Sequence, residues 1–345
     1  MIKVEKQELI KCGMNRPDVM VTFVVCTHNG GGRLVRVVGN LAQRNKAFSV
    51  EIVIVDNAST DGAVQQALES IPSDSPPVRA VREDRIGLAH ARRAGVEQAR
   101  GEIVVCVDDD NLLLDGWFAK LVGVFEMDPA IAACGGYGIG CLPNISMPPW
   151  FEDCSTIYAI GSQAEAAGDV TEEPGYLWGA GLAVRREALI RLYQRGFRFR
   201  AIDRAGSRLL SGGDLELCFA LRLTKWRLWY DPSLVFLHLL GESRFQPRYL
   251  SRLHSGFGAG SVMLDAYDWV LGNDARFPTR RHRSVAWQLA IALRTLVFPQ
   301  RVVRQHGRIP PEFVAAKYRG RFLQLLRMGF AYDRSFQEIE SAPWR

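Results

Sequence analysis

Short apolar runs alternate with amphipathic segments through the first two thirds of the chain. Apolar runs predict β-strands at residues 19–26, 50–55, 78–81, 103–107, 131–137, 176–184 and 226–238. Patterns with a helical period predict helices at residues 33–43, 62–70, 87–99, 113–125, 186–195 and 213–223. Strands that alternate with helices at this spacing indicate βαβ units. We therefore expect an α/β fold with a mainly parallel sheet flanked by helices.

The alternation ends near residue 240. Helical patterns interrupted by prolines follow it, and the proline-bearing stretch 138–174 is expected to be a long surface loop that shapes a binding site. The sequence thus predicts three parts: an N-terminal tail at residues 1–18, an α/β domain at 19–240, and a mostly helical C-terminal extension at 241–345.

Composition supports an ordinary folded protein, with 345 residues, 48% hydrophobic and 23% charged. The first residues lack the apolar core of a signal peptide, and no apolar run reaches the length of a transmembrane helix, so we expect a cytoplasmic protein. The seven cysteines contain no CxxC pair. They are expected to be reduced core residues rather than metal ligands or disulfides.

Positive charge is concentrated in the C-terminal extension, where residues 241–345 hold 17 basic and 8 acidic residues. The segment 285–298 combines apolar side chains with nearby arginines, a pattern typical of an interfacial helix. One hypothesis is a peripheral contact with the inner face of the membrane. The alternative is a helical cap that packs on the α/β domain or on a second subunit of a homodimer. No nucleic-acid-binding module is recognisable, so no nucleic-acid partner is expected.

Candidate chemistry begins with three consecutive acids, Asp108, Asp109 and Asp110, which follow the nearly all-apolar strand at 103–107. Three adjacent carboxylates repel one another and lose hydration, so a positive partner is expected. A divalent cation such as Mn²⁺ or Mg²⁺ prefers oxygen ligands of this kind. The carboxyl ends of parallel strands are also where α/β sheets bind ligands.

Other polar residues follow predicted strands or open predicted helices. Asp56 and Asp61 follow the strand at 50–55, Asp214 and Glu216 open the helix at 213–223, and His238 ends the last strand. Asp61 and Asp214 could each be a simple helix cap. The glycines at 30–32 fit neither a dinucleotide-binding fingerprint nor a P-loop.

Five segments together resemble the family 2 glycosyltransferases, which have the Rossmann-like GT-A fold. The segments are VVCTHN at 24–29, IVIVDNASTD at 52–61, GLAHARRAGVEQARGEIVVCVDDDN at 87–111, WGAGLAVRREAL at 178–189, and GGDLELCFALR with WYDPSLVFLH within 212–238. The resemblance covers about residues 20–240. It implies a metal-dependent, inverting transfer of a sugar from a UDP- or dTDP-linked donor. The implied acceptor is a hydroxyl of a glycan or a lipid-linked molecule in cell-surface polysaccharide synthesis.

The resemblance also implies roles for individual residues. It implies a divalent cation held by Asp108, Asp110 and His238, and a donor nucleotide contacted by Thr27, Asn29, Asp56, Arg92, Asp108 and Asp109. Asp214 corresponds to the catalytic base, with Glu216 as a competitor for that role. The acceptor side would comprise Trp178, Gly179, Gly181 and Glu216. Trp178 could instead be a core residue, and strand alternation predicts that Asp109 points away from the cation.

Two other functions remain open on the sequence. A nucleotidyltransferase, or another enzyme of nucleotide-sugar metabolism, would also use an α/β sheet and carboxylate-held Mg²⁺. A non-catalytic protein that binds sugar nucleotides would retain only part of the acidic set. The sequence determines neither the donor sugar nor the acceptor.

Overall fold

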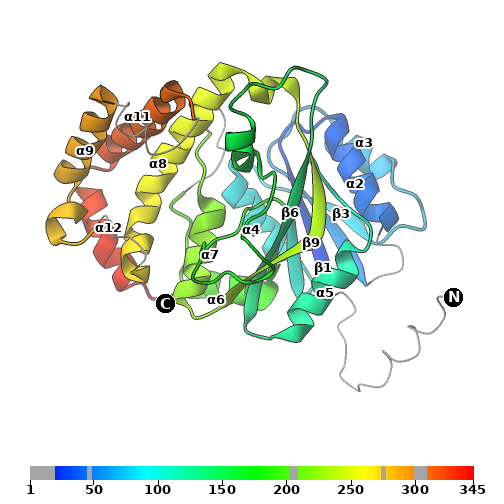
Figure 1. The fold of residues 1–345 in the computed structure, drawn as a ribbon. Helices are drawn as coiled ribbons and strands as arrows, with labels where there is room; N and C mark the ends of the chain where they lie inside the picture. The colour runs from blue at the N-terminus through cyan, green and yellow to red at the C-terminus, as the bar shows by residue number, and fades with distance from the viewer. Residues whose placement is uncertain (1–19, 45–48, 202–208, 273–276, 299–308) are drawn as a thin grey trace.

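The computed structural model describes residues 20–44, 49–201, 209–272, 277–298 and 309–345 (Figure 1). The predicted N-terminal tail at 1–18 lies outside the described residues. All nine described strands belong to one mixed sheet, in the order β3-β2-β1-β4-β8-β6-β9-β5, and β7 pairs with β9. The strands are β1 (Val21–Thr27), β2 (Val50–Asp56), β3 (Val78–Arg82), β4 (Ile103–Asp108), β5 (Asn111–Leu113), β6 (Ile131–Cys141), β7 (Gly168–Asp169), β8 (Leu182–Arg185) and β9 (Arg227–Leu239).

Parallel pairing joins β3, β2, β1 and β4, and it also joins β6 and β9. Strand β8 runs antiparallel between β4 and β6. The expected α/β fold with a mainly parallel sheet flanked by helices is confirmed. In the parallel group all carboxyl ends meet at one edge, which brings Thr27, Asp56 and Asp108 to the same side of the molecule.

Helices cover both faces of this sheet because its central strands are buried on both sides. On β1 and β2, Phe23 and Ile52 belong to the core under α2, α3 and α5, whereas Val24 and Val53 belong to the core under α4, α6 and α7. Figure 1 shows these two helical layers. The helices are α2 (Gly32–Arg44), α3 (Ala63–Glu69), α4 (Leu88–Gln98), α5 (Trp117–Met127), α6 (Arg186–Gln194) and α7 (Gly213–Leu223).

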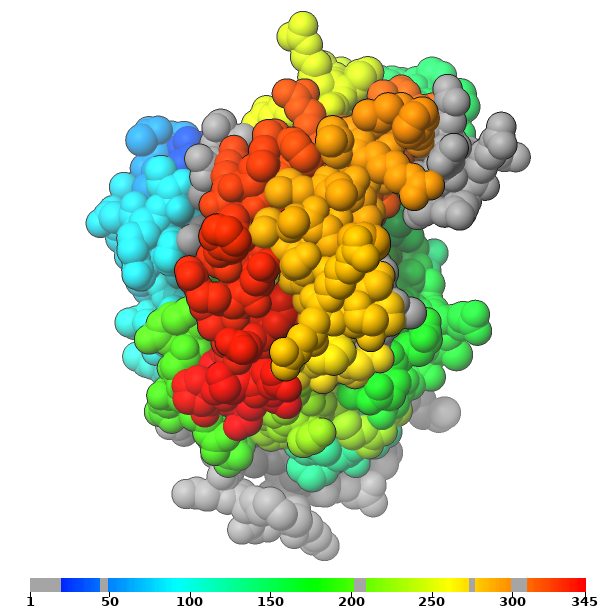
Figure 2. Space-filling view, turned by 90° about the vertical axis from the view of Figure 1, so that its left-hand side faces the viewer, coloured from blue at the N-terminus to red at the C-terminus, as the bar shows by residue number. Residues whose placement is uncertain are grey.

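Every described element after β9 is helical, as the sequence predicts. These elements are η2 (Glu242–Phe245), α8 (Pro247–Leu271), η3 (Arg280–Arg283), α9 (Val285–Val297), α11 (Pro311–Met328) and α12 (Phe330–Glu340). Figure 2 shows them on one side of the molecule, in yellow to red. No helix among the described residues is both long enough and apolar enough to cross a bilayer.

Helix α8 joins this helical layer to the sheet domain through close backbone contacts. A Cβ on Gly258 would lie 1.7 Å from the Lys317 carbonyl oxygen of α11, and one on Gly260 would lie 1.7 Å from the Ser211 carbonyl oxygen. The buried Asp265 carboxylate on α8 also receives two hydrogen bonds from the Arg321 guanidinium of α11. Residues 209–212, which lead into α7, are therefore held against α8.

Three predicted elements differ from the structure. Residues 111–113 form the short strand β5, and the helix predicted from residue 113 begins only at Trp117. The predicted strand at 176–184 forms only from Leu182, since Gly181 has a positive φ of 67° that interrupts strand geometry. The loop predicted at 138–174 contains the end of β6, the 3₁₀ helix η1 (Glu152–Tyr158) and β7. Six described cysteines are free, and all but Cys141 are buried, as expected for core residues.

Candidate active site

A cavity of about 580 Å³ opens where the carboxyl end of β4 meets the start of α7 and the end of β9. Four of the predicted site residues with charged or ionisable side chains line it together: Arg92, Asp108, Asp214 and His238. Its far wall comes from the C-terminal helices, through residues of α8 and Lys317 of α11. The predicted chemistry and the C-terminal extension thus share one cavity.

Each of the three consecutive aspartates forms an ion pair with a different arginine. Asp108 Oδ1 lies 3.5 Å from Arg92 Nη2, and Asp109 Oδ1 lies 3.6 Å from Arg33 Nη2. The third carboxylate belongs to Asp110, which accepts a hydrogen bond from the Arg244 guanidinium. Arginines from α4, α2 and η2 therefore neutralise the cluster for which the sequence predicted only a cation.

Asp110 and His238 form a deeply buried polar pair. Backbone pairing of β5 with β9 places Asn111 opposite His238, which brings the preceding Asp110 close to the imidazole. His238 Nδ1 lies 2.6 Å from the carbonyl oxygen of Tyr158. Because a carbonyl can only accept, Nδ1 carries the proton, and neutral His238 presents a lone pair at Nε2. That nitrogen lies 3.4 Å from Asp110 Oδ1, which is also an acceptor.

Two acceptors that face each other in a buried site need a proton or a cation between them. Asp110 and His238 therefore offer an oxygen and a nitrogen donor to a divalent cation. The third predicted ligand, Asp108, is instead paired with Arg92. Among the described residues, no group of three or more His, Cys, Asp or Glu side chains is arranged to hold a metal ion. The donor set fits a cation whose remaining ligands come from elsewhere.

Gly179 connects Arg92 to Asp214. Its backbone N–H donates to Asp214 Oδ2 at 2.9 Å, and its carbonyl accepts from Arg92 Nη2 at 3.4 Å. A Cβ at this position would lie 2.7 Å from Arg92 Nη2, so the guanidinium occupies the space that only glycine leaves. Asp214, in the first turn of α7, is thereby oriented toward the same cavity as Asp108.

Glu216, the other acid of α7, has different surroundings. Its side chain is fully buried and is not among the residues that line the cavity. The carboxylate accepts hydrogen bonds from the backbone N–H groups of Arg200 and Ala201 at 2.9 Å, and from the Tyr267 hydroxyl at 2.8 Å. Burial raises the pKa of Glu216, although these hydrogen bonds oppose the shift. Its contacts tie residues 200–201 and α8 to α7.

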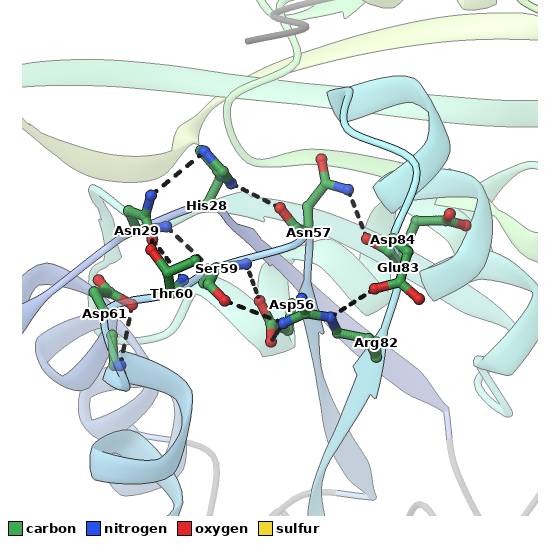
Figure 3. Close-up of polar contacts among 11 residues, drawn as sticks. His28, Asn29, Asp56, Asn57, Ser59, Thr60, Asp61, Arg82, Glu83 and Asp84 are labelled. Carbon is green, nitrogen blue, oxygen red and sulfur yellow. Dashed lines mark hydrogen bonds and ion pairs between the residues drawn. The ribbon is translucent and has the colours of Figure 1, made fainter.

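A second group of polar residues lies at the ends of β1, β2 and β3 (Figure 3). Asp56 accepts from the Ser59 backbone N–H at 2.8 Å and from Arg82 Nη1 at 2.7 Å. Burial would raise the pKa of Asp56, but the hydrogen bonds from Ser59 and Arg82 outweigh it and lower the pKa. Asn29 has a positive φ of 56°, and its side-chain oxygen accepts from the Thr60 N–H at 2.8 Å. The first two βα turns are thus fixed to each other.

Thr27 and Asp109 lie between these two groups. The Thr27 hydroxyl donates to Asp109 Oδ2 at 2.8 Å, which turns the Asp109 side chain toward β1 and α2. A Cβ on Gly30 would lie 2.7 Å from that same oxygen, so the close approach requires glycine. Burial raises the pKa of Asp109, and the neighbouring Asp110 carboxylate adds to the shift.

Of the predicted acceptor residues, only Trp178 and Gly179 line the cavity. Trp178 is half-buried and lines the cavity, whereas its neighbour Leu177 is fully buried in the core. The Trp178 N–H donates to Gln163 Oε1 at 2.6 Å. Gly179 also lines the cavity, but Gly181 lies beneath Phe236 with a φ of +67°.

Sequence reasoning missed several residues that complete the site. They are Arg33, Arg82, Gln163 and Arg244. Arg33 follows the glycines at 30–32, which match no phosphate-loop motif, so its sequence context did not indicate a role in the site. Arg93, next to the predicted Arg92, instead pairs with Glu97 at 2.8 Å and stacks on Tyr193.

Comparisons with known proteins agree with this architecture. A glucosyl-dolichyl phosphate glucuronosyltransferase of Haloferax volcanii is 24% identical over 206 residues, which are 59% of this chain and 63% of that protein. The uncharacterized glycosyltransferase YfnE of Bacillus subtilis is 28% identical over 114 residues, 33% of this chain and 29% of that protein. The chain therefore spans less than two thirds of the length of these relatives.

Among solved structures, residues 1–349 of TarS from S. aureus, in complex with UDP-GlcNAc, show the same fold. The alignment covers 93% of this chain and 92% of that chain, with a TM-score of 0.52 and 14% sequence identity. The model of the family described as glycosyl transferase family 2 matches residues 22–192, from β1 through α6. By this match, residues 22–192 of the chain are similar to the glycosyl transferase family 2.

Proposed function

We propose that this protein is a metal-dependent, inverting glycosyltransferase that moves a sugar from a nucleotide-diphosphate sugar to an acceptor hydroxyl. One observation carries the proposal: Arg92, Asp108, Asp214, His238 and Arg244 face a single cavity in a chain similar to this family. Such a reaction needs positively charged side chains that bind the diphosphate and a carboxylate that accepts a proton. The arginines and Asp214 of this cavity provide both.

Asp214 is our candidate for the general base. Each of its carboxylate oxygens accepts one backbone N–H, from Gly179 and from Leu215, and retains a second lone pair for an acceptor hydroxyl. In an inverting reaction the acceptor hydroxyl attacks the anomeric carbon from the face opposite the leaving diphosphate. The base removes the hydroxyl proton while the C–O bond to the diphosphate breaks. Glu216 lacks this access because its oxygens are held by three buried donors.

The donor nucleotide would extend from the cavity toward Asn29 and Asp56. Asp56 remains ionised at neutral pH because its pKa is lowered, and an ionised carboxylate can accept an N–H of a nucleobase. Asp110 and His238 would hold the divalent cation, and the oxygens of the donor diphosphate would complete its ligand set. Such a cation would supply charge stabilisation to the leaving diphosphate.

The acceptor side suggests a molecule with an apolar part. Leu253, Phe257 and Leu264 of α8 line the wall of the cavity opposite the sheet. The Haloferax relative is named for a dolichyl phosphate-linked sugar, which has such a part. We propose a lipid-linked acceptor, reached by a peripheral contact of the C-terminal helices with an anionic bilayer.

Apolar side chains exposed on those helices support the membrane contact. Phe330 is 79% exposed, and further exposed apolar residues on or next to α9 and α11 are Ile291, Leu293, Val297, Phe298, Leu323 and Leu326. The exposed Arg294 and Arg327 lie among them in sequence and suit anionic head groups. Co-sedimentation with anionic liposomes tests this contact, and an absence of salt-sensitive binding would refute it.

The experiment for the main proposal is a binding and turnover panel of UDP-, dTDP- and GDP-sugars with and without Mn²⁺. We expect one nucleotide class to raise the melting temperature only when Mn²⁺ is present. We expect Asp214→Asn to abolish transfer while donor binding persists, and Asp110→Asn to weaken Mn²⁺-dependent donor binding. Near-normal turnover by Asp214→Asn would exclude it as the base.

A further inference from the structure

Arg244 differs from the other two arginines of the aspartate cluster in the burial of its partner, because Asp108 is 22% exposed and Asp109 is 15% exposed. Arg33 is 51% exposed, whereas Arg244 is 19% exposed and its partner Asp110 only 4%. Arg244 also lies in η2, outside the segment 22–192 that matches the family model. The family match therefore does not cover the arginine that contacts the best candidate ligand of the cation.

Each oxygen of Asp110 faces a different functional partner. Oδ1 faces His238 Nε2 and also accepts from Asn111 Nδ2 at 3.2 Å, and Oδ2 accepts from the Arg244 guanidinium. A divalent cation bound by Asp110 and His238 would lie about 2.0–2.2 Å from each donor atom. It would then be next to a fixed positive guanidinium in a buried site, where like charges repel strongly. The cation and Arg244 therefore compete for Asp110.

The backbone of Arg244 is fixed while its side chain reaches open space. Its carbonyl accepts from the Tyr158 hydroxyl at 3.0 Å, and the next residue, Phe245, packs against Phe151 and Tyr158. The Arg244 side chain lines the cavity that also contains Asp108 and Asp214. A rotation of this side chain alone can move the guanidinium from Asp110 to a ligand in the cavity.

We propose that Arg244 is an exchange residue: it neutralises Asp110 in the free protein, and it moves to the donor diphosphate when the divalent cation binds Asp110 and His238. This inference rests on the proposed function. A guanidinium released from a carboxylate can bind a diphosphate in the same way, since carboxylate and phosphate oxygens both accept paired N–H groups. The exchange links cation binding to donor binding without movement of the backbone.

The exchange predicts effects of opposite sign in one variant. Arg244→Gln removes the competitor of the cation, so Mn²⁺ alone should bind more tightly, by on the order of tenfold. The same variant lacks the ligand of the diphosphate, so inorganic pyrophosphate at saturating Mn²⁺ should bind more weakly, by on the order of tenfold. Isothermal titration of the full chain measures both affinities without turnover. A purely structural role for Arg244 would weaken both.

Arg248→Gln is the matched control because Arg248 is an exposed arginine at the start of α8. It should leave both affinities unchanged. If Arg244→Gln does not fold, Arg244→Lys keeps the charge but loses the paired N–H geometry, and it should weaken pyrophosphate binding. Mn²⁺ affinity in Arg244→Gln equal to or below the wild-type value overturns the exchange. The proposed function fails separately, if no nucleotide sugar supports transfer although Mn²⁺ and pyrophosphate bind as described.

Discussion

The two acids of α7 give the sharpest prediction, because they are two residues apart and have opposite expected roles. Glu216→Ala removes a fully buried carboxylate and leaves three donors without an acceptor: the N–H groups of Arg200 and Ala201 and the Tyr267 hydroxyl. Each buried donor without a partner costs about 1–3 kcal/mol. Water that enters the space left by the side chain would satisfy part of this demand, so we expect the low end, about 3 kcal/mol in total.

The assay combines urea unfolding with turnover measured on the folded protein. Glu216→Ala should lower the unfolding midpoint, whereas kcat per folded molecule should change little. Tyr267→Phe removes one of the three donors and serves as the matched variant. In the Glu216→Ala background it should cost less than in the wild type, since the hydroxyl no longer has the carboxylate as a partner.

Asp214→Asn should give the reverse pattern, with stability retained and turnover lost. The amide oxygen can still accept the Gly179 N–H, so the local backbone keeps its hydrogen bond. The reasoning is refuted if Glu216→Ala unfolds at the wild-type urea concentration. It is refuted equally if Glu216→Gln, in a folded state, loses turnover as completely as Asp214→Asn.

Further predictions concern the donor turn and two glycines. Arg82→Gln should unfold at lower urea than the wild type at pH 7. The pKa of Asp56 is lowered in the folded state, so its ion pair with Arg82 stabilises the folded protein at pH values above the ordinary carboxyl pKa of about 3.9. The difference in unfolding midpoint between wild type and Arg82→Gln should therefore shrink as the pH falls below that value. A difference that stays constant down to about pH 2 would contradict this. Gly179→Ala should displace the Arg92 guanidinium and weaken pyrophosphate binding in titration calorimetry, because the added Cβ would lie 2.7 Å from Nη2; unchanged affinity would count against a role for Arg92. Gly260→Ala should lower the melting temperature and reduce kcat together, since its Cβ would displace the backbone that leads into α7. A change confined to stability would show that α8 does not position the site.

The fold class, and the edge of the sheet where the chemistry lies, could be predicted from the residue pattern alone. Apolar runs of strand length, separated by helical patterns, allow few arrangements other than a parallel sheet with helices on both faces. Because parallel strands end at one edge, Asp56 and Asp108 had to lie at the same edge of the sheet. The helix at 213–223 was predicted with the bounds that the structure has.

The pairing of each aspartate with its arginine could not be predicted and became clear only from the packing of the elements. Arg33, Arg92 and Arg244 come from three separate elements, and nothing local to any of them indicates an aspartate partner. Asp214 and Glu216 are both acids in the first turn of α7, and their residue types alone do not show which one is catalytic. Residues two apart on a helix do not share a face, so they meet different surroundings. The packing of α8 and residues 200–201 around Glu216 makes one acid a buried acceptor and leaves the other at the cavity. Such contacts join residues distant in sequence, so the physical reason lies in the packing of the elements rather than in any one segment.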